Sequence, residues 1–262
     1  STRPDAWLHP RLRSRNMPNK VVPFIVEGPS DECVVDAFDE VLSEARVHFQ
    51  GINSGGDITL YKIHPENFRS IPGKGIQGKI KNLIKREIDK SHEFKERDIF
   101  AVALLMDLDG ALIPEDRVME GLTLEYTMDG INTPDVSGIR MRNVEKKARI
   151  GELIGEREIS LTSRRKVPFR AFFMSRNLEH ALWNIPDNLT GNAGKEQKRQ
   201  LSLEFIERCE DDPAFFKQLM LSSDLLHDAD GYKASWDWSF SGVNSLRRGS
   251  NVGLLPEEFG IS

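Results

Sequence analysis

Apolar residues along this chain gather into short runs that stop at acidic residues. The first run covers residues 21–26 and is followed directly by Glu27. The second covers residues 99–106 and is followed by Asp107 and then Asp109. Short runs that are rich in β-branched and large aliphatic residues predict strands that are buried on both faces. Such strands are typical of a parallel sheet that is covered by helices.

Helical periodicity and further apolar runs predict the elements around these two strands. Pro29 and Ser30 begin a predicted helix, with Asp31 in its first turn, where an acid is favourable. The other expected elements are a strand over residues 45–52, a basic helix after a Gly-rich loop near 72–79, a charged helix over 142–158, a strand over 167–174, and helices over 194–210 and 213–222. The pattern therefore predicts an α/β fold with a parallel sheet flanked by helices.

The same pattern divides the chain into three parts. Residues 1–20 contain several prolines and arginines without periodicity, which predicts an extended basic arm. Residues 21–183 contain all the predicted strands and form the α/β domain. Residues 184–262 are predicted to be a helical C-terminal extension.

Several acidic residues lie where the predicted strands end. In a parallel sheet the ligand crevice lies outside the carboxyl ends of the strands, so Glu27, Asp107 and Asp109 are expected to converge there. Asp31 follows Glu27 by four residues and is either a helix-start acid, a metal ligand or both. Carboxylate oxygens are the ligands that Mg²⁺ prefers. The sequence therefore predicts a site for Mg²⁺ or Mn²⁺ at this edge of the sheet.

Composition narrows the class of protein. The chain has 36 Lys and Arg against 41 Asp and Glu, a net charge of −5, so any contact with nucleic acid depends on local basic patches and metal ions. Its two cysteines, Cys33 and Cys209, form no zinc pattern and favour a reducing, cytoplasmic location. No apolar run has the length of a membrane span, and the N-terminus has no secretory signal, so we expect no membrane partner.

Two regions supply basic side chains that could meet phosphate. The predicted basic helix carries Lys79, Lys81, Lys85 and Arg86 on the face expected to be exposed to solvent. The loop before it lacks the Gly-Lys-Ser/Thr ending of a phosphate-binding loop. Near the C-terminus, Trp236, Trp238 and Phe240 are followed by Arg247 and Arg248, a mixture that either stacks on nucleic acid or packs onto the core.

A strand that ends in Glu27-Gly28 and a later strand that ends in Asp107-x-Asp109 resemble the TOPRIM domain of topoisomerases, primases and OLD-family nucleases. The resemblance covers roughly residues 20–183. The spacing from Glu27 to Asp31 is closest to the OLD-type nucleases. Many TOPRIM domains continue to a third aspartate, where this chain has Ala111. The strand and Gly55-Gly56 loop before residue 58 resemble the second βα unit of TOPRIM proteins.

The resemblance implies a metal-dependent nuclease. Glu27, Asp107 and Asp109, with Asp31, would hold Mg²⁺ or Mn²⁺, and Glu27 is also placed to act as the general base. Glu179 follows the last predicted strand, where TOPRIM nucleases often carry a further acid, but it is equally explained as a first-turn helix acid. A basic group near the scissile phosphate would come from one of four candidates: Lys195, Lys233, Arg247 and Arg248.

Stand-alone TOPRIM proteins similar to this one act beside a separate ATPase in phage-defence systems such as PARIS. The resemblance therefore implies the toxic effector of such a system, which cleaves DNA or RNA, tRNA included. Its expected partners are the nucleic acid, an ATPase and a second copy of the chain in a homodimer.

Two other interpretations remain open. The segment from Asp107 to Leu112 also resembles the first motif of HAD-type phosphatases, in which Asp107 would be a covalent nucleophile and Asp109 the acid/base. Ser175 would then supply the second motif. Against this, Ala111 replaces the usual threonine and Glu27 has no role. The chain could also be a TOPRIM-like binding module without catalysis.

Overall fold

The computed structural model describes residues 20–60, 75–186, 189–227 and 230–261, so the predicted N-terminal arm lies almost entirely outside the described residues. Its centre is a five-stranded sheet in the order β2-β1-β3-β8-β7. The strands are β1 (Val21–Val26), β2 (His48–Asn53), β3 (Val102–Asp107), β7 (Glu158–Thr162) and β8 (Arg165–Met174). β2, β1, β3 and β8 are parallel, and β7 joins β8 as an antiparallel hairpin partner. The predicted α/β fold with a mostly parallel sheet is confirmed.

The two strands that precede the acidic residues are neighbours in the middle of this sheet. Phe24 of β1 pairs with Ala103 of β3, and Asp107 at the end of β3 pairs with Met174 at the end of β8. Every residue of β1 is buried. This burial on both faces explains why the two runs are apolar throughout and do not alternate.

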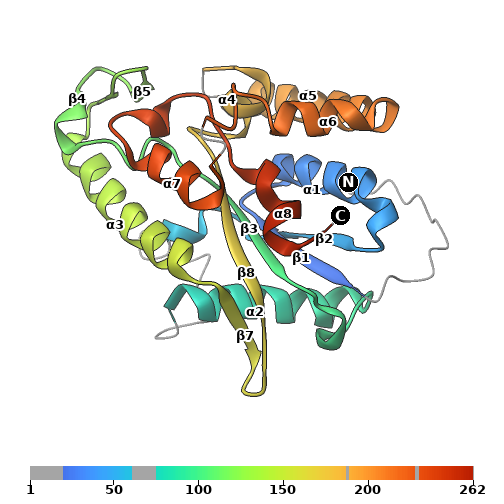
Figure 1. Cartoon of the computed structure of the whole chain (residues 1–262). Coiled ribbons are helices and arrows are strands. Elements are labelled where there is room, and N and C mark those ends of the chain that lie inside the picture. The colour runs from blue at the N-terminus through green and yellow to red at the C-terminus, as the bar shows by residue number, and fades with distance from the viewer. Residues whose placement is uncertain (1–19, 61–74, 187–188, 228–229, 262) are drawn as a thin grey trace, which may run out of the picture.

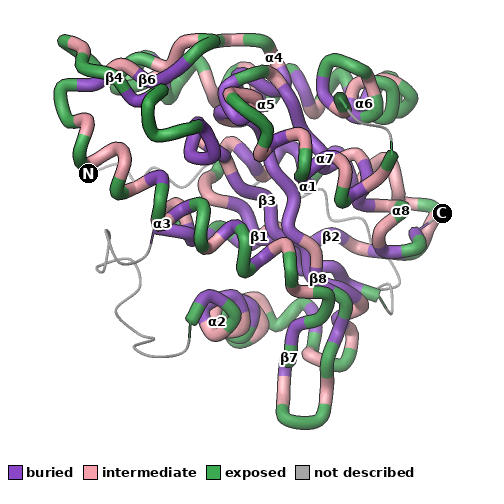
Figure 2. The backbone as a smooth tube through the Cα atoms, turned by 60° about the vertical axis from the view of Figure 1, so that its left-hand side comes forward, coloured by how far each residue is buried: buried purple, intermediate pink, exposed green. Residues whose placement is uncertain are grey.

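Helices cover both faces of the sheet (Figures 1 and 2). One face carries α2 (Gly75–Ser91) and α3 (Val136–Gly155), and the other carries α1 (Glu32–Val41) with the C-terminal helices packed over it. The C-terminal helices are α4 (Leu178–Trp183), α5 (Gly191–Asp211), α6 (Pro213–Met220), α7 (Tyr232–Phe240) and α8 (Leu255–Phe259). Their apolar side chains belong to the same hydrophobic core as the sheet.

A small second sheet precedes α3 and lies near its N-terminal end (Figure 1). It consists of β4 (Val118–Glu120), β6 (Ile131–Thr133) and β5 (Glu125–Tyr126), in that order. The side chain of Asp135 accepts a hydrogen bond from the Gly138 backbone nitrogen at 2.8 Å and caps α3. This cap starts the helix at Val136, six residues before the predicted start.

The final segment of the chain completes one edge of β8. Beyond the end of β7, the backbone nitrogen of Ser175 donates to the carbonyl of Gly249, and that of Phe173 donates to the Asn251 side chain. The Ser250 hydroxyl donates to the Phe173 carbonyl. The backbone of Met174 bridges that of Ser250 in antiparallel fashion. These bonds pair an edge that would otherwise be open.

Two sequence predictions need correction. Lys79 is only 2% exposed and not on the solvent face of α2, because it follows Ile76 by three residues and shares its buried stripe. Residue 158 belongs to β7, whose alternation of Ile159 and Leu161 with polar residues is a strand pattern.

Of the two outcomes expected for the C-terminal aromatic residues, packing onto the core is the one that Trp236 adopts. Its ring packs onto Phe173, with ring centroids 4.8 Å apart.

Within the described ranges, the structure contains no helix that is long and apolar enough to cross a membrane.

Candidate active site

Carboxylates from neighbouring strands meet at one edge of the central sheet. Glu27 follows β1 directly, and Asp107 is the last residue of β3. The Asp107 backbone nitrogen donates to Oε1 of Glu27 at 3.2 Å. The structure thus brings together two predicted site residues that are 80 positions apart in sequence.

Asp31 lies against this pair through the turn that follows β1. It ends the short 3₁₀-helix Pro29–Asp31, and its Oδ2 accepts a hydrogen bond from the Gly28 backbone nitrogen at 2.8 Å. The pKa of Asp31 is raised to about 6, chiefly by burial and also by the Glu179 carboxylate, while the hydrogen bond from Gly28 opposes the rise. Asp31 is therefore a helix-start acid that also faces the carboxylate cluster.

Asp109 takes part in an ion-paired triad with Lys146 and Asp57. The Lys146 ammonium, Nζ, lies 2.6 Å from Oδ2 of Asp57 and 2.7 Å from Oδ2 of Asp109. Lys146 comes from α3, and Asp57 from the loop after β2. The Lys146 side chain is completely buried, and its two carboxylates raise its pKa despite that burial.

The backbone around Asp109 is fixed from two sides. Asp109 has a φ of 49°, a left-handed conformation that an aspartate tolerates better than most residues. Its backbone nitrogen donates to the carbonyl of Arg176, and its own carbonyl accepts from the Arg142 guanidinium, both at 2.8 Å. The turn after β3 is therefore held by α3 and by the turn after β8.

Glu179 reaches the same edge from the turn after β8. It lies in the first turn of α4, is 2% exposed, and its Oε1 is 2.7 Å from Nζ of Lys198 on α5. Asn177 caps α4, because its side chain accepts from the His180 backbone nitrogen. Glu179 therefore flanks Asp31 and Asp107, and its negative charge raises the pKa of both.

Burial and mutual repulsion dominate the electrostatics of the central pair. Burial raises the pKa of Glu27, and Asp57 and Asp109 raise it further while Lys146 opposes them. Burial also raises the pKa of Asp107, with added repulsion from Asp31 and Glu27. In the described part of the chain, no ion pair joins Glu27 or Asp107 to a basic side chain. A cation bound between them would relieve this repulsion.

Asp57 differs from the central pair because it has a counter-charge. Burial alone would raise the pKa of Asp57, but the Lys146 ammonium and hydrogen bonds from Lys146 and Thr59 outweigh burial and lower it. The ionised form of Asp57 is therefore favoured by the buried Lys146 ammonium, whereas Glu27 and Asp107 form no ion pair within the described residues.

Sequence reasoning did not select Asp57, Lys146 or Lys198. Lys146 did leave a signal, since it lies at helical spacing between the buried Asn143 and Ile150 on α3. A lysine on a buried stripe needs an acidic partner, because an unpaired buried charge is costly. Asp57 and Lys198 carry no comparable local signal.

Within the described residues, none of the four basic residues predicted near the phosphate forms an ion pair with a site carboxylate. Lys195, Lys233 and Arg247 are exposed, and Lys233 pairs with Asp237 in its own helix. The Arg248 guanidinium donates to the carbonyl of Ala181 and pairs with Asp224, both outside the carboxylate cluster. Within the described residues, Lys146 and Lys198 are the lysines that contact site carboxylates.

The carboxylates are held by their own partners and do not surround a common point. Among the described residues, no group of three or more His, Cys, Asp and Glu side chains is arranged so that it could hold a metal ion. Glu27 and Asp31 each accept a backbone hydrogen bond, and Asp57 and Asp109 accept from Lys146. Metal binding by this set would require side-chain rotation. The donors still suit Mg²⁺ or Mn²⁺ in kind, since all are hard carboxylate oxygens.

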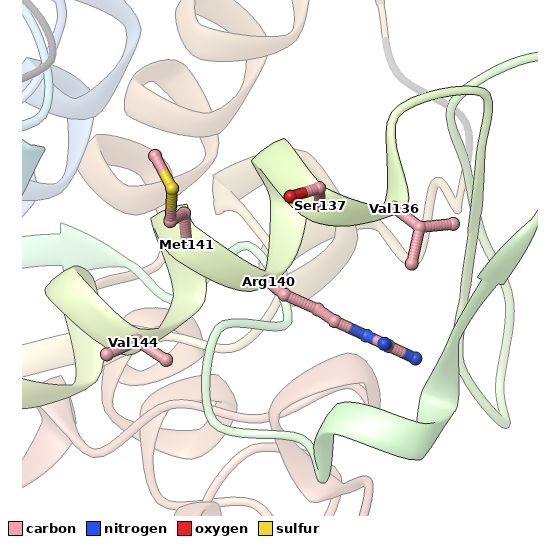
Figure 3. Close-up of a pocket in the computed structure, with 5 residues that line it drawn as sticks. All are labelled: Val136, Ser137, Arg140, Met141 and Val144. Carbon is pink, nitrogen blue, oxygen red and sulfur yellow. The ribbon is translucent and has the colours of Figure 1, made fainter.

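A shallow hollow of about 480 Å³ lies apart from these carboxylates, on the first turns of α3 (Figure 3). Its lining residues are Val136, Ser137, Arg140, Met141 and Val144. Figure 3 shows the Arg140 side chain reaching away from the helix, and its guanidinium donates to the carbonyls of Glu115 and Val118. The lining therefore contains no carboxylate, and its one charged group binds the backbone of the small sheet.

Ser175, the residue required by the phosphatase interpretation, turns away from Asp107. Its side chain is fully buried, and its hydroxyl donates to the Asn244 carbonyl at 3.0 Å. Its backbone nitrogen donates to Gly249. In this structure Ser175 therefore fastens the C-terminal segment to the end of β8.

Comparisons of the chain with protein-family models, with curated proteins and with solved structures gave no match. The geometry at the carboxyl edge of the sheet is therefore the basis for assigning a function.

Proposed function

We propose that this protein is a nuclease that hydrolyses phosphodiester bonds with the help of Mg²⁺ or Mn²⁺. The observation that supports this most directly is the hydrogen bond from the Asp107 backbone nitrogen to the Glu27 carboxylate, which brings together two buried acidic residues that form no ion pair within the described residues. Such a pair at the carboxyl edge of a parallel sheet is suited to bind a divalent cation.

Four carboxylates would hold the metal: Glu27, Asp107, Asp109 and Asp31. When bound, the metal would polarise the phosphoryl oxygen and stabilise the charge on the leaving oxygen. Glu179 would add its negative charge close to Asp31 and Asp107 while it remains paired with Lys198.

The chain's own groups can carry the proton and part of the charge. The raised pKa of Glu27 makes its ionised carboxylate a stronger base, which suits a group that accepts a proton from water. Lys198 is 29% exposed at its side chain and can exchange Glu179 for a phosphate oxygen. Lys198 therefore replaces the four sequence candidates as the basic group nearest to the site carboxylates and open to substrate.

The test is cleavage by the purified chain in Mn²⁺, with plasmid DNA, total tRNA and a generic phosphomonoester as separate substrates. We expect one of the two polymers to be cut, with EDTA inhibiting the reaction. Glu27→Gln and Asp107→Asn should each lower the rate at least about 100-fold. Glu44→Gln is the matched control, because Glu44 is an exposed carboxylate outside the site, and its variant should cut normally.

Stability separates loss of chemistry from loss of fold. Glutamine keeps an oxygen that can accept the Asp107 backbone hydrogen bond and removes one negative charge from the cluster. Glu27→Gln should therefore melt at the same temperature as the unchanged protein or a higher one, in EDTA.

The alternatives make different predictions in the same assay. Turnover of the phosphomonoester that survives Glu27→Gln, with neither polymer cut, would replace the nuclease by the phosphatase. Inactivity on all three substrates, with no binding of Mn²⁺, would favour the non-catalytic binding module.

We further infer, from the resemblance to stand-alone TOPRIM effectors, that the nuclease acts in phage defence under the control of a separate ATPase. We expect a gene for such an ATPase beside the gene for this chain, and co-expression of the two should yield a complex that survives purification. A chain that binds no such ATPase, and whose expression is harmless to cells, would contradict this role.

A further inference from the structure

We infer that the outward face of α3 is a dimer interface, on which α3 of a second copy of this chain packs side by side and in the same direction. The inference goes beyond the proposed function and uses none of the carboxylates of the candidate active site.

Two lines of residues run along opposite sides of α3. One line is buried and includes Asn143, Lys146 and Ile150. The other line, called the exposed stripe below, consists of exposed residues that follow one another in steps of four, three, four, three and four positions: Ser137, Met141, Val144, Ala148, Gly151 and Gly155. Alternating steps of three and four are the repeat by which two helices pack along each other in a coiled coil. The outward face of α3 therefore has the pattern of a helix-pairing surface.

Exposed large apolar side chains gather on and near the N-terminal half of α3. Among the described residues, six of the eight such side chains lie between positions 119 and 144: Met119, Leu122, Leu124, Met128, Met141 and Val144. Met141 and Val144, on the exposed stripe, are 69% and 56% exposed and line the shallow hollow of Figure 3. Figure 1 shows α3 along one side of the molecule. Exposed apolar side chains that gather in this way mark an interaction site.

Two glycines of the exposed stripe have no explanation within the chain itself. By contrast, Gly138 is needed near the start of the helix, because a Cβ there would lie 2.1 Å from Oδ2 of Asp135. Gly151 and Gly155 are not left-handed, and a Cβ on either would meet no described atom within 4 Å outside the helix backbone. A glycine inside a helix, such as Gly151, costs about 0.5–1 kcal/mol relative to alanine. A second helix that approaches closely from outside explains them, because helix axes come nearer where side chains are small.

The charges beside the exposed stripe fit a second copy of the same helix. Lys147 lies on one flank and Glu152 on the other. Glu152 is 51% exposed although Arg149 of its own helix binds it. When two copies of α3 run in the same direction, the basic flank of each faces the acidic flank of the other, so Lys147 of one copy meets Glu152 of the second copy. When they run in opposite directions, flanks of like charge meet, which is unfavourable. Ion pairs of this kind add little strength but select the partner and its direction.

The parallel arrangement also brings the two small sheets together. Each small sheet lies near the N-terminal end of its own α3, so in a parallel pair both sheets lie at the same end. In an antiparallel pair they would be separated by the length of the 20-residue helix, about 30 Å. The exposed side chains of Met119, Leu124 and Met128 are then close to the apolar end of the exposed stripe and extend the interface.

Sedimentation velocity of the full chain measures this association. The unchanged protein should sediment with about twice the chain mass of 29.8 kDa. Val144→Glu places two glutamates against each other within the pair and should weaken association at least about 100-fold. Gly151→Leu fills space that is open in the single chain, so it should keep the circular dichroism of the fold but sediment as a monomer. Leu221→Glu is the matched control, because Leu221 is 45% exposed and lies outside α3, and it should stay dimeric.

Engineered cysteines measure the direction of packing. In a parallel pair each residue of the exposed stripe faces its own counterpart, so Val144→Cys and Gly151→Cys should each form a disulfide between copies when diamide is added as the oxidant. In an antiparallel pair only one position, at the centre, can face itself. The native Cys33 and Cys209 are buried and should give no background. Leu203→Cys on α5 is the control and should not cross-link.

Each other outcome overturns part of the inference. A monomer at every concentration would refute the interface. A dimer that survives both Val144→Glu and a folded Gly151→Leu would place the interface elsewhere. Cross-linking at only one of the two cysteine positions would refute the parallel direction. None of these measurements uses nuclease activity, so their failure would leave the proposed function standing, and a failure of the proposed function would leave the interface standing.

Discussion

Removing the buried cation should destabilise the fold itself, even without metal or substrate. Lys146→Met leaves Asp57 and Asp109 buried beside each other without their shared counter-charge. Breaking a buried ion pair from one side costs about 3–5 kcal/mol. At about 2–4 °C per kcal/mol for a chain of this size, the melting temperature should fall by roughly 10 °C.

A second substitution tests whether the cost comes from the charges. Asp57→Asn alone should cost less, about 1–3 kcal/mol, because Lys146 keeps Asp109 and the amide can still accept from Thr59. In the double variant Asp57→Asn/Lys146→Met, both the cation and one of its two anions are gone. Its loss of stability should be smaller than the sum of the single losses by about 1–3 kcal/mol.

Urea denaturation in EDTA at pH 7.5 measures all four proteins of this cycle. Lys147→Met should lie within about 0.5 kcal/mol of the unchanged protein, since Lys147 is exposed. If the two single losses add to within about 0.5 kcal/mol, the charges of Asp57 and Lys146 are not coupled and the reasoning fails.

Two further predictions concern the turn after β8. Arg176 is 1% exposed and donates to the carbonyls of Pro186 and Tyr126, so Arg176→Lys should cost about 2–3 kcal/mol in urea denaturation, and an unchanged midpoint would contradict this. The pKa of His180 is lowered to about 4, first by burial and then by the positive charges of Arg176 and Arg248. Because the unfolded chain then binds more protons, stability should be full above about pH 6.5 and fall as the pH drops towards 4. His180→Gln should lose this dependence between pH 7.5 and 5, and an equal slope in both proteins would refute the assignment.

The central pair of the site could be predicted from sequence because its position follows from strand direction alone. Glu27 and Asp107 end two buried apolar runs, and parallel strands place such ends at one edge of a sheet. The capping role of Asn177, and with it the position of Glu179 in the first turn of α4, follows in the same local way. The sequence signals on which these predictions depend lie within a few residues of each strand end.

The remaining site residues could not be predicted because their roles depend on packing between distant segments. Lys146 meets Asp57 across 89 positions of sequence, and Lys79 is buried although lysines on a helix usually face water. Both lysines lie on the apolar stripes of their helices, so their helical spacing, and not their residue type, indicates that they are buried. For Arg248 the reason is different. The residues around it in sequence do not reveal that its guanidinium donates to the backbone of α4.

The pairing of β8 with residues 244–251 has a consequence for the order in which the chain can fold during its synthesis. The backbone groups of Phe173 and Ser175 form hydrogen bonds with Gly249, Ser250 and Asn251, which lie more than 70 positions later in the sequence. While the ribosome is still adding those positions, the strand that leads to Glu179 has an open edge capable of pairing with another chain. Contacts so distant in sequence also form slowly. The complete β8 edge, and with it the folded form of the candidate site, would therefore arise only after translation has passed residue 251.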